Sequence, residues 1–224
     1  MTDQLPSEND LDALSSSPLG DQSGGLFRDS RLWLLLGLAC LVGLGLGFWL
    51  KAGQAPDGHS PEVGFARAMS VHHAQAVTMA QLLYDRTEDE TMRVIALDIM
   101  LTQQYQIGEM TAWVSFWGPP SPENEPAMAW MGMPASERMP GMASPEEINR
   151  LRGLSGVEAD GLFMQLMIPH HRSGVEMAQA ILARTDQPQV RRLAEAIEVS
   201  QESEIAAMQE LLQQKGFSPL PASP

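Results

Sequence analysis

Apolar residues follow two different patterns along the chain, and the change comes near residue 60. Residues 32–50 form one apolar run without a charged side chain. Beyond it the apolar positions recur at intervals of three and four, which is the period of a helix with one buried face. This second pattern predicts four helices with turns at DRTEDE and RTDQP, over residues 62–85, 88–117, 157–184 and 188–215.

Polar and proline-rich segments separate these elements. Residues 1–30 are rich in Ser, Gly and Asp and show no periodicity, so we expect them to be disordered. Residues 52–61 are typical of a linker, 119–143 of a Pro- and Met-rich loop, and 217–224 of a tail. The sequence SPEE at 144–147 predicts a further short helix, because its Ser and its second Glu have the spacing of a capping box.

The apolar run has the length of a membrane span. Its 19 residues, at ~1.5 Å per residue, just cross a hydrocarbon core of ~30 Å. Trp33 and Trp49 stand at its two ends, where tryptophans meet the membrane–water interface. A cleaved export signal is the alternative, and the long polar stretch ahead of the run favours a transmembrane anchor over 31–51.

The charges beside the run predict how the chain would cross the membrane. Arg28 and Arg31 precede it, and Lys51 follows it. Positive residues collect on the cytoplasmic side, so we expect the N-terminus inside the cell. The rest of this single-pass protein of the cell membrane would then lie outside the cytoplasm, in the periplasm or at the cell surface.

The helical region is an internal duplication. A shift of 98 residues places 65–118 on 163–216 without a gap, and 17 of the 54 aligned positions are identical. The repeated unit is a pair of helices, which cannot bury its apolar face alone, whereas two such units can bury each other's. The sequence therefore predicts an all-α fold, in which residues 62–216 form a four-helix bundle of two duplicated αα-hairpins after one transmembrane helix.

Charge and cysteine content narrow the possible partners. The formal net charge is −14, from 14 Lys and Arg against 28 Asp and Glu, which argues against a nucleic-acid partner. Cys40 is the only cysteine, so neither an internal disulfide nor a cysteine-based zinc site is possible. Methionine is the abundant residue instead, with 15 in the chain, and these cluster.

Four of the five histidines form two adjacent pairs, His72 with His73 and His170 with His171, at equivalent places of the duplication. His72 and His170 fall on the apolar stripes, so their rings would enter the bundle interior, where a polar group needs a partner. A histidine that simply packs in the core is the ordinary interpretation of one such residue. Two matched pairs favour a metal site.

Thioethers replace carboxylates around these pairs. Di-iron bundles carry a Glu three residues before a His, whereas Met69 and Met167 hold that position here. Neutral S and N donors suit copper, Cu(I) above Cu(II), and disfavour iron and manganese. Because a bound imidazole must be neutral, affinity is expected to fall as the pH drops through ~6.5. The expected ligands come from Met69, His72, His73, Met79, Met167, His170, His171 and Met177.

Two further features are a proline beside the second histidine pair and the methionines of the loop between the hairpins. Pro169 lacks an N–H and crowds the carbonyl of Gln165, so we expect it to disturb its helix locally. The loop between the hairpins could offer a soft ion several thioethers, and packing onto the bundle or a membrane is an equal alternative. These secondary candidates are Met128, Met131, Met133, Met139 and Met142.

The chain from about residue 60 to 216 resembles the family catalogued as domain of unknown function 305. The resemblance rests on FARAMSVHHAQAVTMA, MPGMASPEEINRLRGLSGVEADGLFMQLMIPHHRSGVEMAQ and QESEIAAM. It implies an exported or membrane-anchored four-helix protein of the ferritin-like superfamily. It also implies a link to copper, because some members are associated with copper binding and copper tolerance.

The two halves differ at positions where the family has acids. The family's second hairpin helix usually contains Q-x-x-E-I-x-x-M, and the resemblance adds Glu204 from this motif as a metal ligand or as a base beside one. Gln106 takes its place in the first half. Asp160 falls where the family often has an acid, and we match it with Gly64 in the first half. We therefore expect the two halves to be unequal sites.

Three functions fit these observations. The favoured hypothesis is a membrane-anchored, extracytoplasmic copper-binding protein for storage, buffering or delivery, and not an enzyme. A metal-dependent redox enzyme is the first alternative, although the sequence holds no nucleophile triad, no phosphate-binding loop and no E-x-x-H pair. A metal-free scaffold for a protein partner is the second, and a homo-oligomer stays open.

Overall fold

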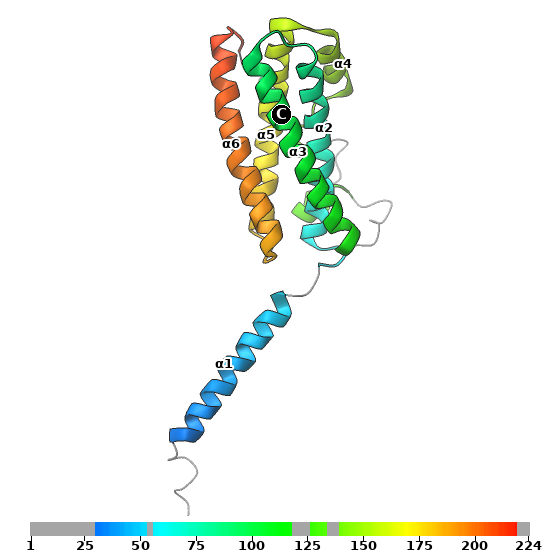
Figure 1. The fold of residues 1–224 in the computed structure, drawn as a ribbon. Coiled ribbons are helices and arrows are strands. Elements are labelled where there is room, and N and C mark those ends of the chain that lie inside the picture. Colours follow the sequence, from blue (N-terminus) through cyan, green and yellow to red (C-terminus); the bar gives the residue numbers. More distant parts are fainter. Residues whose placement is uncertain (1–29, 53–55, 118–125, 134–138, 219–224) are drawn as a thin grey trace, which may run out of the picture. The chain divides into compact units, whose positions relative to one another are not determined.

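The computed structural model describes residues 30–52, 56–117, 126–133 and 139–218 (Figure 1). The chain forms two compact units, Met1–Gly53 and Gln54–Pro224. The segment expected to be disordered, apart from its last residue, lies outside the described residues, as do parts of the expected linker and most of the tail.

The first unit contains one helix, α1 (Ser30–Ala52). Its side chains are described from Trp33 to Gly47 and are exposed along this whole stretch. Their hydrophobic members include Leu34, 72% exposed, and Leu41, 68% exposed. Within the described part of the chain, no helix has the length and apolar character needed to cross a membrane.

The second unit is a bundle of four long helices, which Figure 1 shows side by side. The sequence-based expectation of an all-α fold is confirmed, because the described residues contain no strand. Every predicted long helix begins and ends within two residues of an observed one. The elements are α2 (Pro61–Tyr84), α3 (Glu90–Trp117), the 3₁₀ turn η3 (Ala129–Met131), α4 (Pro145–Gly153), α5 (Gly156–Leu182) and α6 (Pro188–Gln214).

Local chemistry explains where these helices begin. Ser60 caps α2, since its side chain accepts a hydrogen bond from the backbone N–H of Val63. The capping box predicted for α4 is present in both directions between Ser144 and Glu147. Each of these helices, like α6, also opens with a proline, whose missing N–H is not needed in a first turn.

Helices α2 and α5 are equivalent in the duplication and run antiparallel. At one end of the pair, the backbone N–H of Gly156 donates to the carbonyl of Arg86 over 2.9 Å. At the other end, the Thr185 hydroxyl donates to the carboxylate of Glu62 over 2.7 Å. The start of each helix therefore lies beside the end of the other, as an approximate two-fold axis between the hairpins requires.

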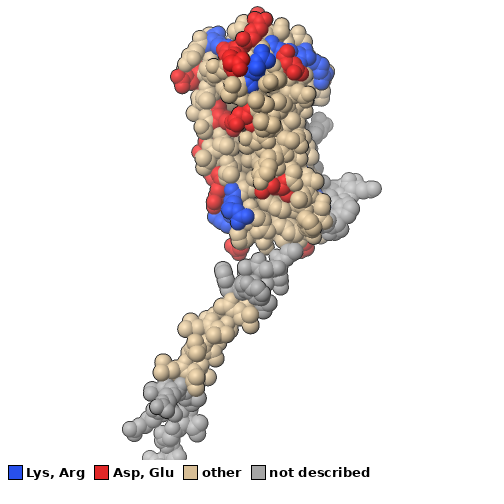
Figure 2. Space-filling view, in the orientation of Figure 1, with Lys and Arg blue, Asp and Glu red and all other residues tan. Residues whose placement is uncertain are grey.

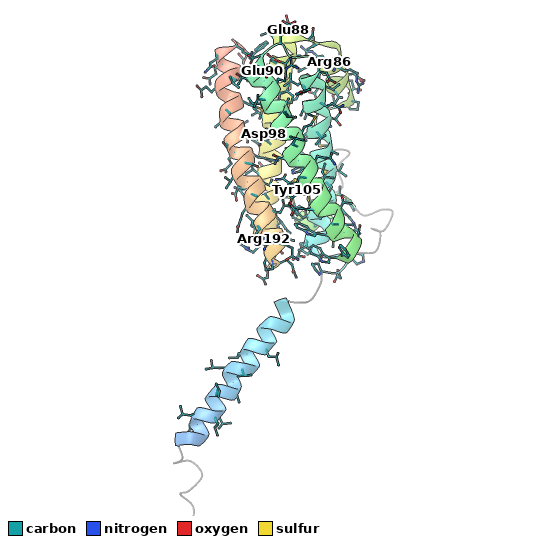
Figure 3. The ribbon with its side chains drawn as sticks, viewed as in Figure 1. Arg86, Glu88, Glu90, Asp98, Tyr105 and Arg192 are labelled. Atoms are coloured by element: carbon teal, nitrogen blue, oxygen red, sulfur yellow. The ribbon has the colours of Figure 1, made fainter. Side chains whose placement is uncertain are left out.

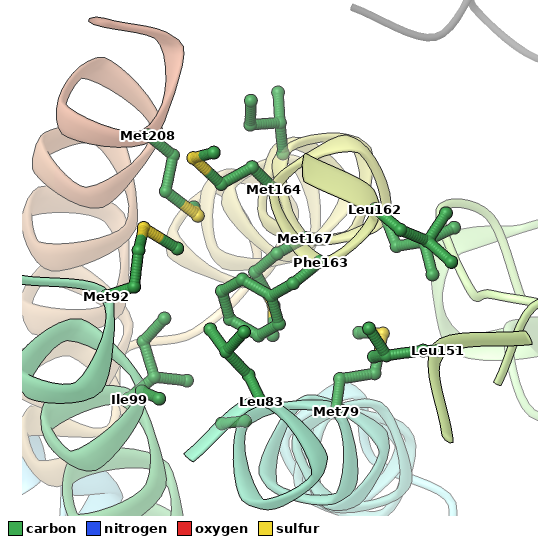
Figure 4. Close-up of a cluster of buried hydrophobic side chains, with 14 of the residues drawn as sticks. Met79, Leu83, Met92, Ile99, Leu151, Leu162, Phe163, Met164, Met167 and Met208 are labelled. Atoms are coloured by element: carbon green, nitrogen blue, oxygen red, sulfur yellow. The ribbon is translucent and has the colours of Figure 1, made fainter. Parts of the chain in front are cut away.

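The bundle core divides into two apolar clusters. The first surrounds Phe163 near the start of α5, and Figure 4 shows it with Leu83, Ile99 and Met167 pointing inward from three helices. The second surrounds Phe65, which is the duplicate of Phe163 and meets Trp130 edge-on at 5.6 Å between ring centroids. The histidine pairs belong to neither cluster.

Pro169 does not interrupt its helix. Helix α5 runs without a break from Gly156 to Leu182, so the expected local disturbance is absent from its helical assignment. A proline removes one hydrogen bond of the helix, but most residues of α5 between Ala159 and Ile181 are buried, and this packing holds the helix together.

Candidate metal centre

Two histidines stack at the middle of the bundle. The rings of His72 on α2 and His170 on α5 lie 3.7 Å apart between centroids, with 28° between their planes. Both side chains are fully buried. None of their four ring nitrogens has a hydrogen-bond partner among the described residues. Buried polar groups are normally paired, so this layer is the first candidate for a ligand.

The second histidine of each pair contacts the neighbouring helix of its own hairpin. His73 Nε2 lies 2.7 Å from Oε1 of Gln106 on α3. His171 Nε2 lies 2.5 Å from Oε2 of Glu204 on α6. The Glu-to-Gln difference between the two halves thus falls directly on a histidine contact. The Nδ1 atoms of His73 and His171 lack partners within the described structure.

Two buried amides that were not among the predicted site residues join this layer. Gln103 and Gln201 are equivalent in the duplication, 2% and 1% exposed, and their side-chain N and O atoms have no described partner. A Cβ on Gly174 would lie 2.2 Å from Oε1 of Gln201, so this amide lies against the turn of α5 that follows His170. Their signal was an identical polar residue at a buried helical position in both halves.

The expected methionine ligands lie on both sides of the histidine layer. Because α2 and α5 are antiparallel, Met69 shares the second cluster with Met177, while Met79 shares the first cluster with Met167. All four side chains are at most 1% exposed. Each side of the layer thus holds one of these thioethers from α2 and one from α5.

The described residues form no metal site from His, Cys, Asp and Glu alone. Among the described residues, no three His, Cys, Asp or Glu side chains come together in a way that could hold a metal ion. A site at this layer would therefore need thioethers or amides beside the imidazoles. Which of the candidate residues bind a metal stays a prediction.

Burial favours the neutral form of three of these imidazoles, those of His72, His73 and His170. It holds the pKa of His72 and of His170 well below the usual 6.5, and the charges that neighbouring histidines would carry lower both further. The pKa of His73 falls to about 3, again chiefly through burial, although its hydrogen bond to Gln106 acts in the opposite direction. The expected loss of metal affinity through pH ~6.5 is therefore revised, since these rings stay neutral to lower pH in the folded protein.

The last part of the described loop packs onto the bundle near this layer. Gln75 on α2 holds the backbone of Ala143 through two hydrogen bonds, of 2.9 and 2.7 Å. Gly141 has φ +74°, and a Cβ on it would meet the carbonyl of Pro169 at 2.7 Å and Cα of His170 at 3.2 Å. The loop backbone therefore lies directly against the second histidine pair, and this close approach requires glycine.

The five loop methionines have different environments. Met128 is buried in the second cluster, and Met131 and Met139 pack against it. Met142 is half-buried, while Met133 is 36% exposed. Packing against the second cluster thus explains three of the five methionines. It does not explain Met133 and Met142.

The match of Asp160 with Gly64 is wrong. The shift of 98 residues places Glu62 opposite Asp160, and both acids are buried at the starts of equivalent helices. Asp160 accepts a hydrogen bond from Lys215, and the Thr185 hydroxyl donates to Glu62. Gly64 has a different role, because a Cβ there would lie 2.5 Å from Cβ of Trp130.

An all-helical bundle of two duplicated hairpins, with paired histidines and methionines in its core, defines the class of this protein. The chain belongs to the family described as Domain of unknown function (DUF305), which it matches over residues 62–212. The family resemblance found in the sequence is therefore confirmed.

Two solved structures of this family are similar to the chain. A DUF305 protein from Streptomyces coelicolor, described as secreted, is 44% identical with a TM-score of 0.67, over 71% of this chain and 96% of that one. A DUF305 fragment from Deinococcus radiodurans is 36% identical with a TM-score of 0.58, over 71% of this chain and 99% of that one.

The chain is also similar to CopM, which has been solved with bound metal ions, and to part of one viral protein. CopM in its Cu(II)-bound form is 28% identical with a TM-score of 0.55, over 68% of this chain and 96% of that one. CopM has also been solved in Cu(I)-bound and Ag-bound forms. "Uncharacterized protein L153" of Acanthamoeba polyphaga mimivirus is 36% identical over 48 residues, which are 21% of this chain; the match spans about a third of that protein, 32%.

Proposed function

We propose that this protein binds copper, preferentially Cu(I), in the core of its bundle and serves to store, buffer or deliver it. The observation that carries this proposal is the set of ten buried polar atoms without partners at one level of the bundle. They belong to His72, His73, Gln103, His170, His171 and Gln201. Leaving a buried polar atom unpaired costs about 1–3 kcal/mol, so a bound ion that pairs several of them is strongly favoured.

The donor chemistry supports a soft ion. Burial favours the neutral form of His72, His73 and His170. The predicted ligands on either side are thioethers, which favour Cu(I) and compete poorly for hard ions. Glu204 would act through His171, because a carboxylate on the far ring nitrogen orients a metal-binding imidazole and fixes its tautomer. The similarity to CopM, solved with Cu(II), Cu(I) and Ag, adds support.

We propose binding and not catalysis as the task of this site. The four core histidines are 0% exposed, so a substrate cannot reach them in this conformation. A buried ion would exchange only when the bundle opens locally, and slow exchange suits storage or buffering. A single-turnover test of copper-loaded protein with hydrogen peroxide and an organic reductant should show no more product than copper in buffer.

Replacing His72 and His170 together by Ala tests the site. We expect at least a tenfold loss of Cu(I) affinity in competition with a chromogenic chelator, because both central imidazoles are removed. His59→Ala is the matched control, since His59 is exposed and outside the layer. Equal affinities of the double variant and the unaltered protein would sink the bundle site.

We further propose that residues 31–51 anchor the protein in the cell membrane through the apolar run 32–50, with its N-terminus in the cytoplasm and residues 62–216 outside. The uncharged run of 19 residues and the flanking basic residues support this proposal. The similarity to a family member that is described as secreted supports an extracytoplasmic bundle. A reporter that works only in the cytoplasm, fused after Pro224, should be inactive, and activity there would reject this topology.

A further inference from the structure

Helix α3 carries an exposed apolar stripe along its outward face. Five large side chains of this face lie three, four or eleven residues apart and are 38–84% exposed. From residue 91 to the end of the stripe, α3 has three charged residues, of which Asp98 is exposed and Arg93 and Glu109 are half-buried. We call the set the α3 stripe: Val94, Leu97, Leu101, Tyr105 and Phe116.

The duplication provides an internal reference for this face. The equivalent positions on α6 are Arg192, Glu195, Val199, Ser203 and Gln214, so only one of the five is apolar. Helix α3 packs on α2 as α6 packs on its equivalent α5, so the packing within a hairpin does not require an apolar outer surface on α3. Figure 2 shows uncharged side chains over most of the length of α3, and Figure 3 places Asp98 and Tyr105 on it.

We propose that the α3 stripe is the contact between two copies of this chain, with their α3 helices antiparallel. Gly108 and Ala112 lie on the same face, and a Cβ on Gly108 would meet nothing within 4 Å. In an antiparallel pair centred between residues 104 and 105, Leu101 faces Gly108 of the second copy and Leu97 faces Ala112. Large side chains then meet small ones, as close helix packing needs.

Charge distinguishes this arrangement from a parallel one. In a parallel pair in register, Asp98 would face Asp98 of the second copy, and like charges in contact are unfavourable. In the antiparallel pair it faces Thr111, and the two Asp98 residues are about 20 Å apart, beyond the screening length of about 8 Å at physiological salt. In a dimer with a two-fold axis, both copies use the same surface, so the α3 stripe alone can form the contact.

The size of the stripe sets the strength of the pair. From Val94 to Phe116 it is about 33 Å long, and a helix about 10 Å wide then covers on the order of 400 Å² per copy. A stable interface buries about 800 Å² per partner, so the pair is weak in dilute solution. Crosslinking at a defined protein concentration is therefore the suitable measurement.

The test uses the full chain in detergent, with Cys40 changed to Ser so that each variant has one cysteine. Tyr105→Cys should form disulfide dimers with diamide as oxidant, a choice that keeps copper out of the experiment. Its matched control is Ser203→Cys, the exposed equivalent on α6. We expect at least ten times more dimer for Tyr105→Cys. Val94→Cys should stay monomeric, because the two copies of residue 94 are about 30 Å apart in the antiparallel pair.

A charge in the stripe gives the second arm of the test. Adding Leu101→Glu to Tyr105→Cys should reduce dimer at least tenfold, whereas Val199→Glu, at the equivalent and similarly exposed position of α6, should leave it unchanged. Circular dichroism shows that each variant is folded. Equal dimer yields for Tyr105→Cys and Ser203→Cys would overturn the proposal, and strong dimers of Val94→Cys would replace the antiparallel pair with a parallel one.

Discussion

At the scale of single residues, one substitution between the halves changes what a histidine contacts. His171 has a carboxylate within 2.5 Å, whereas His73 has an amide at 2.7 Å. A carboxylate accepts a proton from imidazole and stabilises positive charge on the ring, while an amide oxygen only accepts a hydrogen bond. The second half of the duplication therefore holds the histidine whose ring is oriented by a charged partner.

Exchanging these partners should affect copper affinity unequally. Glu204→Gln is expected to weaken Cu(I) binding by about 10- to 100-fold, the usual effect of removing a carboxylate behind a metal-binding histidine. Gln106→Glu places the same carboxylate behind His73 and should not weaken binding. Competition titrations of both variants measure this, and equal losses in the two would show that the carboxylate acts only through packing.

At the scale of elements, helix boundaries follow from the sequence because they depend on local chemistry. Ser60 and Ser144 as caps, and prolines in first turns, place the helix starts without knowledge of the fold. The duplication gave the arrangement of the two hairpins, and the period of three and four placed His72 and His170 inside. Element ends and the histidine layer were thus predictable.

Contacts between distant elements could not be predicted in this way. Nothing in the spacing of Gln103 and Gln201 says that their amides remain unpaired, and the close approach of Gly141 to Pro169 depends on the path of a loop. The continuity of α5 through Pro169 likewise depends on packing from its neighbours. These features arise from tertiary packing, which periodicity does not encode.

Lys215, at the end of α6, forms ion pairs with residues of two other parts of the bundle. Its ammonium lies 2.6 Å from Asp89, next to the start of α3, and 3.0 Å from the buried Asp160 on α5. Burial opposes the charge of Lys215, but its two hydrogen bonds outweigh that effect and raise its pKa. The hydrogen bond from Lys215 also lowers the pKa of Asp89. The equivalent residue in the first half is Trp117, so this ionic contact exists at one end only.

Lys215→Met should therefore destabilise the bundle by about 3 kcal/mol, because it leaves the Asp160 carboxylate buried without its cation. Urea unfolding at pH 7 measures this. Adding Asp160→Asn should recover part of the loss, since the unpaired charge is then removed as well. A loss below about 0.5 kcal/mol in the single variant would show that solvent reaches Asp160 and that the contact behaves like a surface ion pair.

At the scale of the whole molecule, the buried histidines link folding to pH. Burial lowers the pKa values of His72, His73 and His170, so these rings bind protons in the unfolded chain, near pH 6.5, but not in the folded one. Stability is therefore complete above pH 6.5 and is lost as the pH falls. The loss continues until the folded rings can also be protonated, which for His73 is near pH 3.

This linkage predicts acid unfolding of the metal-free protein. Each such histidine contributes about 1.4 kcal/mol per pH unit below the unfolded pKa, so the three together remove about 4 kcal/mol per unit. A domain with 5–15 kcal/mol of stability would then unfold a few units below pH 6.5. Urea unfolding at pH 7, 6 and 5.5 should show that the free energy of unfolding falls more steeply with pH as the pH decreases.

His73→Gln should reduce the slope of this free energy against pH by about a third, while His59→Ala should not change it. An identical slope in His73→Gln would mean that His73 is protonated equally in the folded and unfolded states. Saturating Cu(I), which binds the neutral rings of the folded state only, should move the transition to lower pH.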